Sequence, residues 1–473
     1  MNKRLNKKNI FLILGILMLV VIGYLLPVPA ALEHAAVQAG STGKTALRVL
    51  AVTVLAVCWW SGAIFPDWLT AIAMLTLWTL LGGFPFSTVF GSFAGTSTWI
   101  IFGAFCLATA ISKTGLFKRL SWFLLQVFPP TFQGQTLAMI VIGLICSPLI
   151  PSATAKALLG VSIAMGLADT MEYAADSKGR YGMFFAAWAG FGLSAPIFVS
   201  GSVYGYTLMG VLPEDCGIDW GKWALAMIPW TIVVFVSLYV IIRFFFKPVD
   251  TVALSKEYAR EQYRKLGKLE GKELQTAIVL CATVVLWTLE SRIGVNASVS
   301  GMIAAFFCFA LGILEPKEIY TAPNWNLVVF VGGVLSLGSI FSKVGIDLWV
   351  QEVLNPLFGH VSSTILVCIL IAVITILVRF LLAAHSAAII VMMAIFAPVA
   401  ATIGLSPFVI GMIIYTSGMC WFVPYQNVVF TTSITCTEGK VKYNKTLLFC
   451  VIYEIISMAA CLISLPYWKM LGV

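Results

Sequence analysis

Two short polar clusters lie in the middle of long apolar stretches of the sequence. Their polar members are Ser152, Thr154 and Lys156 in the first cluster, and Arg379, His385 and Ser386 in the second. An ionisable side chain at the centre of a membrane helix costs about 2.5–3.5 kcal/mol on insertion scales, so its presence there points to function. Hydroxyls at a helix N-terminus, beside a cation, favour a bound anion. These residues therefore predict an anion site inside a membrane.

The composition predicts a membrane protein. Of the 473 residues, 60% are hydrophobic and only 10% are charged, and the mean hydropathy is +0.99, far above the values of soluble proteins. The basic residues behind the net charge of +9 lie at the ends of apolar stretches, so no nucleic-acid partner is expected. The eleven cysteines form no C-x-x-C pair and only three histidines occur, so neither a metal site nor another cofactor is expected.

Eleven apolar stretches are long enough to cross a bilayer, where membrane lipid would surround them. They are residues 10–28, 46–65, 67–83, 97–112, 183–211, 223–246, 274–291, 295–313, 326–342, 407–434 and 447–468. No small-residue cleavage site follows residues 10–28 cleanly, so this stretch is expected to remain as the first membrane helix and not to be removed as a signal peptide.

Two further apolar stretches, residues 135–168 and 362–402, contain the polar clusters and do not fit single spans. Each is too long for one helix and too short for two full crossings, which predicts a re-entrant hairpin of two half-depth helices. Broken backbone at that depth is allowed only where protein or water receives it. Residues 192–201 and 423–427 interrupt two later spans with Gly, Pro and polar residues. The predicted class is an all-α polytopic membrane protein with about 11 transmembrane helices and two re-entrant hairpins.

The basic residues predict the orientation. With the N-terminus in the cytoplasm and the C-terminus outside, about 21 of the 29 Lys and Arg residues lie on the inner side, as the positive-inside rule expects. The count holds only if both hairpins return to the side that they left. The expected location is the plasma membrane.

An internal repeat relates the two halves of the chain. Residues 98–115 align without gaps on residues 328–345, and Gly103 pairs with Gly333. The first copy runs from outside to inside and the second from inside to outside, so the repeat is inverted. A hairpin and a broken span follow each copy, an arrangement that places the binding site of secondary transporters near the bilayer midplane.

The segment Ile150-Pro-Ser-Ala-Thr-Ala-Lys156 resembles the I-P-S-N-T-A-[RK] motif of the divalent anion/sodium symporter family of di- and tricarboxylate carriers, with Ala153 in place of Asn. The second hairpin departs further from Ser-Asn-Thr. Its Ala384-His-Ser-Ala387 is similar to the Ala-His segment of the exchanger branch, which includes citrate/succinate exchangers and the plastid 2-oxoglutarate/malate translocator. Pro424-Tyr-Gln-Asn427 is similar to the family's Pro-Pro-Asn.

The resemblance implies a homodimer in which a fixed scaffold domain holds a transport domain that moves like an elevator. The implied units are residues 1–134 as N-terminal scaffold helices, 135–246 as the first half of the transport domain, 247–273 as a cytoplasmic connector, 274–345 as further scaffold helices, and 346–473 as the second half of the transport domain.

The resemblance and the clusters together give the candidate residues. Those expected to bind substrate are Ser152, Ala153, Thr154, Ser386, Ala387, Ser194, Gln426 and Asn427. Those expected to act as fixed cations in place of sodium are Lys156, His385 and Arg379. The alternative for Ser152 and Thr154 is helix capping. Lys156 could instead reach a membrane interface, His385 could be a satisfied core histidine, and Arg379 could hold hairpin backbone.

The function hypothesis is sodium-independent exchange of dicarboxylates with four or five carbons, such as malate, succinate, fumarate and 2-oxoglutarate. A fixed cation cannot leave with the substrate, so an empty carrier would carry uncompensated charge across the bilayer. The main alternative is a sodium-coupled symporter of the same substrates. A distant alternative is an intramembrane enzyme in which Lys156 or His385 activates Ser152, and a channel is equally distant. No catalytic residue is otherwise expected.

Overall fold

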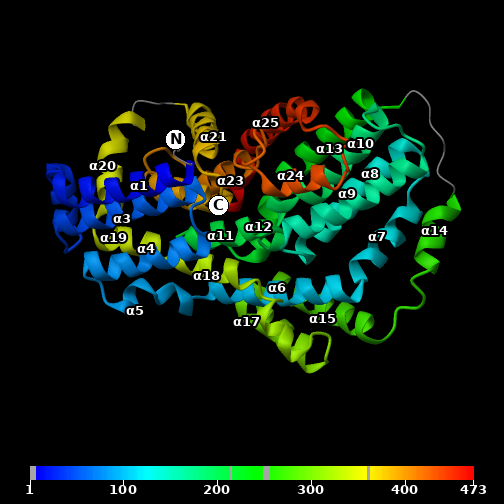
Figure 1. Ribbon diagram of the computed structural model, residues 1–473, viewed down its shortest axis with the longest axis horizontal. Coiled ribbons are helices and arrows are strands. Elements are labelled where there is room, and N and C mark those ends of the chain that lie inside the picture. The colour runs from blue at the N-terminus through cyan, green and yellow to red at the C-terminus, as the bar shows by residue number, and fades with distance from the viewer. Residues whose placement is uncertain (1–6, 214–215, 249–255, 359–362) are drawn as a thin grey trace, which may run out of the picture.

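The computed structural model describes residues 7–213, 216–248, 256–358 and 363–473. Within these ranges all regular secondary structure is helical and no strand occurs (Figure 1). Residues 1–6, on which the predicted N-terminal orientation partly rests, and residues 249–255 of the predicted connector lie outside the described ranges. The predicted all-α class is confirmed.

The helices follow one another along the whole chain. In order they are α1 (Lys7–Val20), α2 (Ala30–Gln38), α3 (Gly43–Gly62), α4 (Asp67–Gly82), α5 (Phe86–Val89), α6 (Thr96–Thr114), α7 (Leu116–Val127), α8 (Phe132–Cys146), α9 (Ala153–Thr170), α10 (Lys178–Ala187), α11 (Val203–Val211), α12 (Trp220–Ala226), α13 (Ile228–Phe245), α14 (Lys256–Arg264), α15 (Gly271–Thr288), α16 (Glu290–Ile293), α17 (Ala297–Ala310), α18 (Trp325–Val334), α19 (Ser336–Lys343), α20 (Ile346–Phe358), α21 (Thr364–Leu381), α22 (His385–Phe396), α23 (Pro407–Ser417), α24 (Val428–Thr435) and α25 (Leu447–Leu471).

Eight helical segments in the described part of the chain are long and apolar enough to cross a membrane. Four shorter apolar helices, α4, α17, α22 and α23, add to them. These segments support a chain that spans the membrane many times, because a bilayer core about 30 Å thick needs about 20 helical residues.

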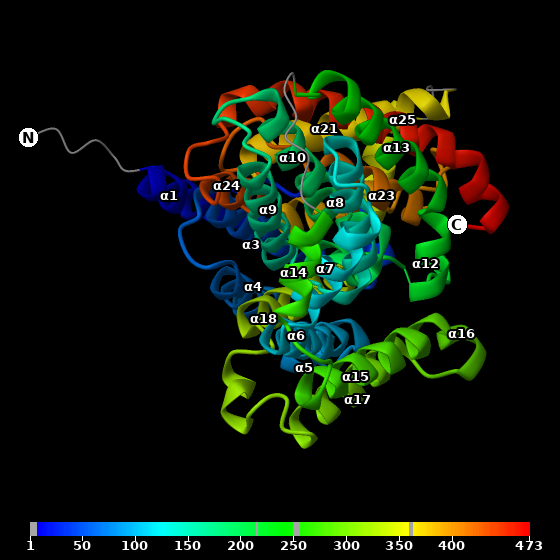
Figure 2. The same cartoon turned by 90° about the vertical axis from the view of Figure 1, so that its right-hand side faces the viewer.

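The helices form two layers, which Figure 2 shows from the side. We call α4, α6, α15, α17 and α18 the lower layer, and α8–α13 together with α21–α25 the upper layer. In the lower layer α6 packs against α17 and α4 packs against α18, while in the upper layer α13 packs against α25. Each of these pairs joins one helix from the first half of the chain with one from the second. The two halves are therefore interleaved in both layers.

Both predicted hairpins are present as pairs of helices with a broken segment between them. Helices α8 and α9 are separated by residues 147–152, and α21 and α22 by residues 382–384. The second limb of each pair packs against a helix of the opposite half, α9 against α24 and α22 against α11. This reciprocal packing agrees with an inverted repeat. The re-entrant placement of the hairpins in a bilayer stays a prediction.

Proline and glycine cause the break in the span predicted over residues 183–211. Helix α10 passes into a π-helical turn over Trp188–Leu193 and then into two short 3-10 turns, Ala195–Ile197 and Val199–Gly201. Pro196 has no N–H to donate and therefore stops the regular hydrogen-bond ladder. Helix α11 resumes at Val203, where the Ser202 hydroxyl accepts a hydrogen bond from the amide of Tyr204 at 3.1 Å. The break predicted here is confirmed.

The sequence-based span map missed several helices that lie beside the spans. Helix α7 packs against α14, which lies in the predicted connector. Arg119 of α7 is buried and forms an ion pair with Glu273 at 2.7 Å. The connector therefore packs against the protein along one face and is not simply a solvated linker. Helices α18 and α19 meet at Leu335, which keeps right-handed helical backbone angles and a hydrogen bond to the carbonyl of Val331, so the span predicted over residues 326–342 is one continuous helical segment.

Ion pairs join the two halves of the upper layer at one end. Lys442 and Lys445 contact the Asp176 carboxylate at 3.1 and 2.7 Å. Their ammonium groups, with the hydroxyl of Tyr181, hold the pKa of Asp176 well below its usual range. Nearby, Lys440 pairs with Asp169 at 3.0 Å. Because these residues come from opposite halves of the chain, the contacts link the first hairpin to the segment that precedes α25.

The crossing of α6 and α17 depends on a close approach at Gly103. A Cβ at this position would overlap the backbone of Gly301, so Gly103→Ala should force the two helices apart. We expect a loss of about 1–3 kcal/mol of stability, typical of overpacking, measured as a lower melting temperature in detergent. Gly338→Ala is the matched control, since a Cβ there meets nothing within 4 Å. An unchanged melting temperature for Gly103→Ala would contradict this packing.

Candidate substrate-binding site

The tip of the first hairpin is the start of helix α9. Ser152 is its N-cap residue, and its hydroxyl accepts a hydrogen bond from the amide of Ala155 at 3.3 Å. Ser152, Ala153 and Thr154 are all half-buried, so this tip remains partly open. Ser152 therefore caps α9, as the alternative given above expects. Capping is compatible with anion binding, because the remaining free N–H groups of the first turn of α9 point out of the helix N-terminus, where an anion could bind.

Lys156 lies one turn into α9 and is fully buried. Its Nζ donates to the carbonyl oxygen of Gly201 at 2.7 Å, and to the carbonyl and hydroxyl oxygens of Ser147 at 3.4 and 3.3 Å. The hydroxyl of Ser147 in turn donates to the carbonyl of Ser194 at 2.9 Å. The ammonium group thus joins the break in the hairpin to the break after α10, and it does not extend towards a membrane interface.

Arg379 is the buried cation of the second hairpin, where it lies in the last turn of the first limb, α21, whereas Lys156 lies in the second limb of its own hairpin. Arg379 is 1% exposed, and its Nε donates to the carbonyl of Gly418 at 2.9 Å. Its Nη1 donates to the carbonyls of Leu382 and Ala383, both at 2.6 Å, and its Nη2 to the carbonyl of Gln426. One guanidinium therefore holds the hairpin tip against the break between α23 and α24. These contacts show Arg379 holding hairpin backbone, which is the alternative role given for it above.

The two buried cations share one chemical environment. Each is surrounded by carbonyl oxygens that broken helices leave without intrahelical partners, supplemented around Lys156 by a hydroxyl. Rings of carbonyl oxygens of this kind also bind alkali cations in membrane proteins. The side chains of Lys156 and Arg379 thus supply positive charge where a free cation would otherwise satisfy the same oxygens.

His385 is the first residue of α22 and is 5% exposed. Its ring centroid lies 4.5 Å from that of Tyr204 and 5.7 Å from that of Tyr415. Its Nε2 has no hydrogen-bond partner and lies against Gly418, where a Cβ would overlap it. Because a buried polar atom is normally paired, this unpaired nitrogen marks a polar atom whose partner the described residues do not supply, as expected of a histidine that contacts a ligand.

The other candidates near the second tip and the first break are buried. Ser386 accepts a 3.5 Å hydrogen bond from the hydroxyl of Thr207, and Ala387 is inaccessible to solvent. The hydroxyl of Ser194 has no hydrogen-bond partner. Two of these positions therefore offer hydroxyls, and Ala387 offers only backbone and a methyl group.

The side-chain amides of Gln426 and Asn427 differ in how many of their hydrogen-bonding atoms have partners. The Oε1 of Gln426 accepts from the amide of Val423 at 3.1 Å, and its Nε2 has no partner. Asn427 caps α24 by accepting from the amide of Phe430 at 3.0 Å, while its Nδ2 donates to the carbonyl of Met419 at 3.0 Å. Gln426 thus keeps a free donor, whereas the amide of Asn427 is already used in fixing the break.

One segment, residues 199–207, connects the two polar clusters. Its contacts are Gly201 with Lys156, Ser202 with Tyr415, Tyr204 with His385, and Thr207 with Ser386. The tertiary structure therefore brings both hairpins to a single strip of the first broken span. Sequence reasoning missed Ser202, Tyr204 and Tyr415. The position of the first two directly after the Gly- and Ser-rich break was a usable signal, but Tyr415 carried none.

A cavity of about 480 Å³ lies beside the first hairpin tip. Ser152 and Ala155 line it on the hairpin side, and the last two turns of α6 with the start of α18 line it on the other side. Thr109 of α6 faces it together with Asn324 and Asn326. The volume is sufficient for a small dicarboxylate. The cavity separates the first hairpin from the lower layer at that end of α6.

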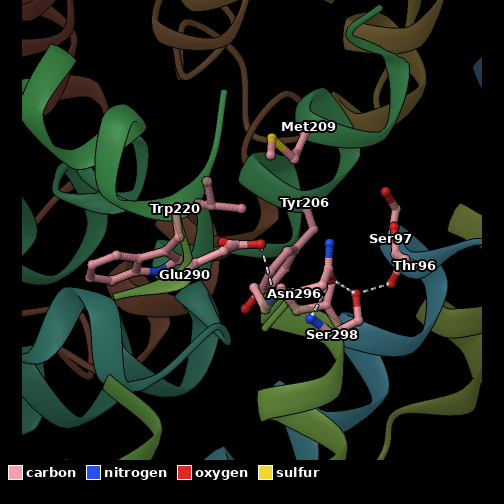
Figure 3. A pocket seen from close by; sticks show the side chains of 11 residues that line it. Thr96, Ser97, Tyr206, Met209, Trp220, Glu290, Asn296 and Ser298 are labelled. Carbon is pink, nitrogen blue, oxygen red and sulfur yellow. Dashed lines mark hydrogen bonds between the residues drawn. The ribbon is translucent and has the colours of Figure 1, made fainter. Parts of the chain in front are cut away.

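The opposite end of α6 is nearly closed. Figure 3 shows the small cavity there, about 60 Å³, between α6, α11 and the start of α17. Ser298 donates to the carbonyl of Thr96 at 2.9 Å, and Glu290 accepts from the amide of Ala297 at 2.9 Å. Tyr206 lies against this group with its hydroxyl unpaired. The two layers are thus in tight contact at one end and apart at the other.

The described residues contain no group of three or more His, Cys, Asp or Glu side chains that could hold a metal ion. Sequence comparison then decides the family. The family model described as the Sodium:sulfate symporter transmembrane region matches residues 6–473. The chain belongs to this family. The expected membership among divalent anion/sodium symporters is confirmed.

Several curated relatives are similar over about two thirds of the chain or more. The inner membrane protein YbhI of Escherichia coli is 28% identical over 67% of this chain and 68% of its own length. The putative malate transporter YflS of Bacillus subtilis is 22% identical, over 75% and 74%. The L-tartrate/succinate antiporter of a pathogenic Escherichia coli strain is 24% identical, over 64% and 67%.

A solved structure supports the fold. The YdaH transporter of Alcanivorax borkumensis, which has an unusual topology, superposes with a TM-score of 0.57 over 82% of this chain and 88% of that one, at 14% identity. The family is one of dicarboxylate and related anion transporters and has members named as antiporters. The protein is therefore a multi-pass membrane transporter, and no enzyme family is indicated.

The four carbonyl contacts of Arg379 predict that lysine cannot replace it, because one ammonium group cannot reach three backbone segments at once. Arg379→Lys should lose on the order of 1.5–3 kcal/mol for each charged hydrogen bond that it fails to make, seen as a lower melting temperature. The matched control is Arg243→Lys, since Arg243 is exposed at the end of α13. Equal melting temperatures for the two variants would contradict the bridging role.

Proposed function

We propose that this protein exchanges dicarboxylate dianions with four or five carbons across the plasma membrane without sodium. Candidate substrates include malate, succinate, fumarate and 2-oxoglutarate. The observation that carries the proposal is the pair of buried cations, Lys156 and Arg379, held among free carbonyl oxygens at corresponding breaks in the two halves. Relatives named as a malate transporter and as an antiporter support this substrate class and mode.

The charge of the two buried cations is the reason why inward and outward transport of substrate would be coupled. Two fixed cations cannot leave with the substrate, so an empty mobile domain carries two charges past apolar surface, at several kcal/mol for each ion. A bound dianion cancels both charges and removes that cost. Only the loaded domain then crosses, which makes transport an obligate exchange. Sodium has no oxygen site left to fill at Lys156, because the ammonium group already uses these oxygens.

We assign the second fixed charge to Arg379, and we assign to His385 a direct contact with substrate. His385 begins α22, where the helix dipole opposes a further positive charge. It also shares Gly418 with Arg379. A neutral imidazole whose Nε2 is unpaired is suited to donate to a carboxylate when that nitrogen carries the proton. The dianion then meets two charges and not three, and the loaded domain is neutral.

The proposed motion is that of an elevator, with the upper layer as transport domain and the lower layer as scaffold. The cavity at the first hairpin tip and the closed contact at the other end of α6 support an inward-facing state, with the cavity on the cytoplasmic side. In this arrangement the N-terminus is cytoplasmic and the C-terminus is outside. Ser152, Thr154 and Ser386 would bind the carboxylates through their hydroxyls, helped by backbone at Ala153 and Ala387.

We further propose that the protein acts as a homodimer within membrane lipid. Helices α15 and α17 of the lower layer expose a series of large apolar side chains, among them Ile278, Val299, Ile303 and Phe306. A fixed scaffold needs a stationary partner against which the transport domain can move. Pairing through this face would supply it.

The hydrogen bonds of Ser152 and Lys156 favour transport over the enzyme alternative. The hydroxyl of Ser152 caps α9, while the donors of Lys156 go to Gly201 and Ser147. A serine nucleophile needs a base within hydrogen-bond reach, and Lys156 is committed elsewhere. Sodium-coupled symport, which the family's description includes, remains the alternative that experiment must separate.

Purified protein in liposomes should take up labelled dicarboxylate only when an unlabelled dicarboxylate is inside, and the rate should not depend on sodium. The reason is that the unloaded transport domain keeps its two fixed charges. The measurement is counterflow with a panel of internal dicarboxylates, with and without sodium. Concentrative uptake into empty liposomes under a sodium gradient would establish symport and refute exchange.

Lys156→Ala should abolish most exchange, because a dianion bound in a low-dielectric site would be under-neutralised. Truncating one partner of a buried charge pair costs about 2–5 kcal/mol, or roughly thirtyfold to several-thousandfold in affinity. Apparent affinity and exchange rate in proteoliposomes measure this loss. Lys343→Ala is the control, since Lys343 is exposed at the end of α19. Wild-type exchange by Lys156→Ala would disprove the fixed-cation mechanism.

A further inference from the structure

One buried acidic residue has no part in the exchange mechanism described above. Glu454 is the single acidic residue of α25 and is 8% exposed. Among the described residues it is the one acidic side chain that is buried. Its Oε1 has no hydrogen-bond partner. An unpaired carboxyl at membrane depth is costly enough to indicate a function.

The surroundings of Glu454 contain one charged group. Helix α25 packs against α12, α13, α21, α23 and the short turn Tyr443–Thr446. The titratable groups that these elements, the segment after α23 and α25 itself place around the carboxyl are Arg379, Cys420, Cys450, Tyr453 and Cys461. Helix α13 contributes only apolar buried side chains. Arg379 is thus the sole charge that acts on Glu454 from these elements.

Arg379 does not form an ion pair with Glu454. Its four hydrogen bonds go to backbone carbonyls at the hairpin tip and at the break between α23 and α24. The two side chains therefore interact only through the field between them. A buried carboxylate without a close partner costs several kcal/mol when ionised, so its charge is set by whether it holds a proton.

The state of Glu454 changes the charge balance of the upper layer. With Glu454 neutral, Lys156 and Arg379 give two positive charges, which a dianion cancels. With Glu454 ionised, the same layer has one net positive charge, which a monoanion cancels and a dianion exceeds. Since uncompensated charge opposes movement through apolar surroundings, the proton on Glu454 decides which charge of substrate can cross.

We propose that Glu454 is a proton-binding site in the mobile layer and that a dianion crosses only together with a proton on this carboxyl. The inference rests on the exchange function proposed above. The proton comes from water on the side where substrate binds and is returned to water on the other side, so no other reactant is needed. In exchange of dianion for dianion the proton crosses in both directions. In exchange of dianion for monoanion one proton moves with the dianion.

The test is the pH dependence of exchange in proteoliposomes with wild-type protein and Glu454→Gln, which keeps the shape of the neutral acid. Fumarate is the substrate, because both of its carboxyl groups are ionised over the range used. From about pH 6.5 upward the wild-type rate should fall as a single required proton is lost, approaching about tenfold for each pH unit once Glu454 is mostly ionised. Glu454→Gln should change by less than about twofold. His385 is present in both proteins, so the difference isolates Glu454.

A second readout is the response to membrane potential. At both ends of the range, wild-type fumarate exchange should be insensitive to an imposed potential, because only the protonated and therefore neutral loaded domain crosses. Exchange at alkaline pH that responds to the potential would mean that the domain also crosses with Glu454 ionised, and would contradict the proposal. Glu454→Gln should stay insensitive at both ends of the range. Glu454→Asp should keep the wild-type pattern, since it retains an ionisable carboxyl. Glu352→Gln, an exposed position on α20, is the matched control and should behave as wild type.

The outcomes separate the two proposals. If wild-type protein shows no sodium-independent exchange at any pH, the proposed function itself fails. If it exchanges and Glu454→Gln follows the same pH profile, only the proton site is refuted. A Glu454→Gln protein that is monodisperse and thermally stable yet inactive at both ends of the pH range would also refute it, since the neutral amide should then suffice.

Discussion

Backbone carbonyl groups that lose their helical partners inside a membrane must find other donors, and this constraint organises the centre of the protein. Hydrocarbon offers no water, so each unsatisfied polar group costs several kcal/mol. Both halves of the chain break their helices in the interior of the protein, and a buried cation satisfies the freed oxygens at each break. Lys156 joins Ser147 to Gly201, and Arg379 joins the second hairpin tip to Gly418. The charges that stabilise the breaks are also those that a dianionic substrate would neutralise.

The same constraint links structure to transport. A cation that is covalently part of the chain holds the broken helices together in every state, whereas a bound sodium ion can leave. Rigidity at the breaks and a buried positive charge are therefore obtained together, and under the exchange mechanism proposed above that charge restricts which loaded states can move. Glu454, the one buried acidic group in the described part of the chain, enters this balance. All the donors of Arg379 bind backbone oxygens, so Arg379 forms no ion pair with Glu454. Under the proposal above, gain or loss of the proton on Glu454 then changes the net charge of the upper layer.

Much of the architecture was predictable because local sequence patterns determine it. Apolar length predicts spans, and the polar clusters predict where two apolar stretches break, at residues 147–152 and 382–384. The alignment of Gly103 with Gly333 revealed the repeat. Helices α7 and α14 were missed because they are amphipathic and short, so they resemble solvated loops in a hydropathy pattern.

The candidate site, too, was predictable from the sequence only in part. The sequence by itself determined the membrane class, the two hairpins and the presence of Lys156, His385 and Arg379 near their tips, because ionisable residues inside apolar runs are conspicuous. Only the tertiary structure decided their partners. Gly201 lies 45 residues after Lys156, and Tyr415 lies 213 residues after Ser202, and no local pattern relates such positions. In the packed structure the Nε2 of His385 has no hydrogen-bond partner, whereas Asn427 is engaged in capping α24. Long-range packing determines which polar groups are satisfied, and this in turn determines which remain for a substrate.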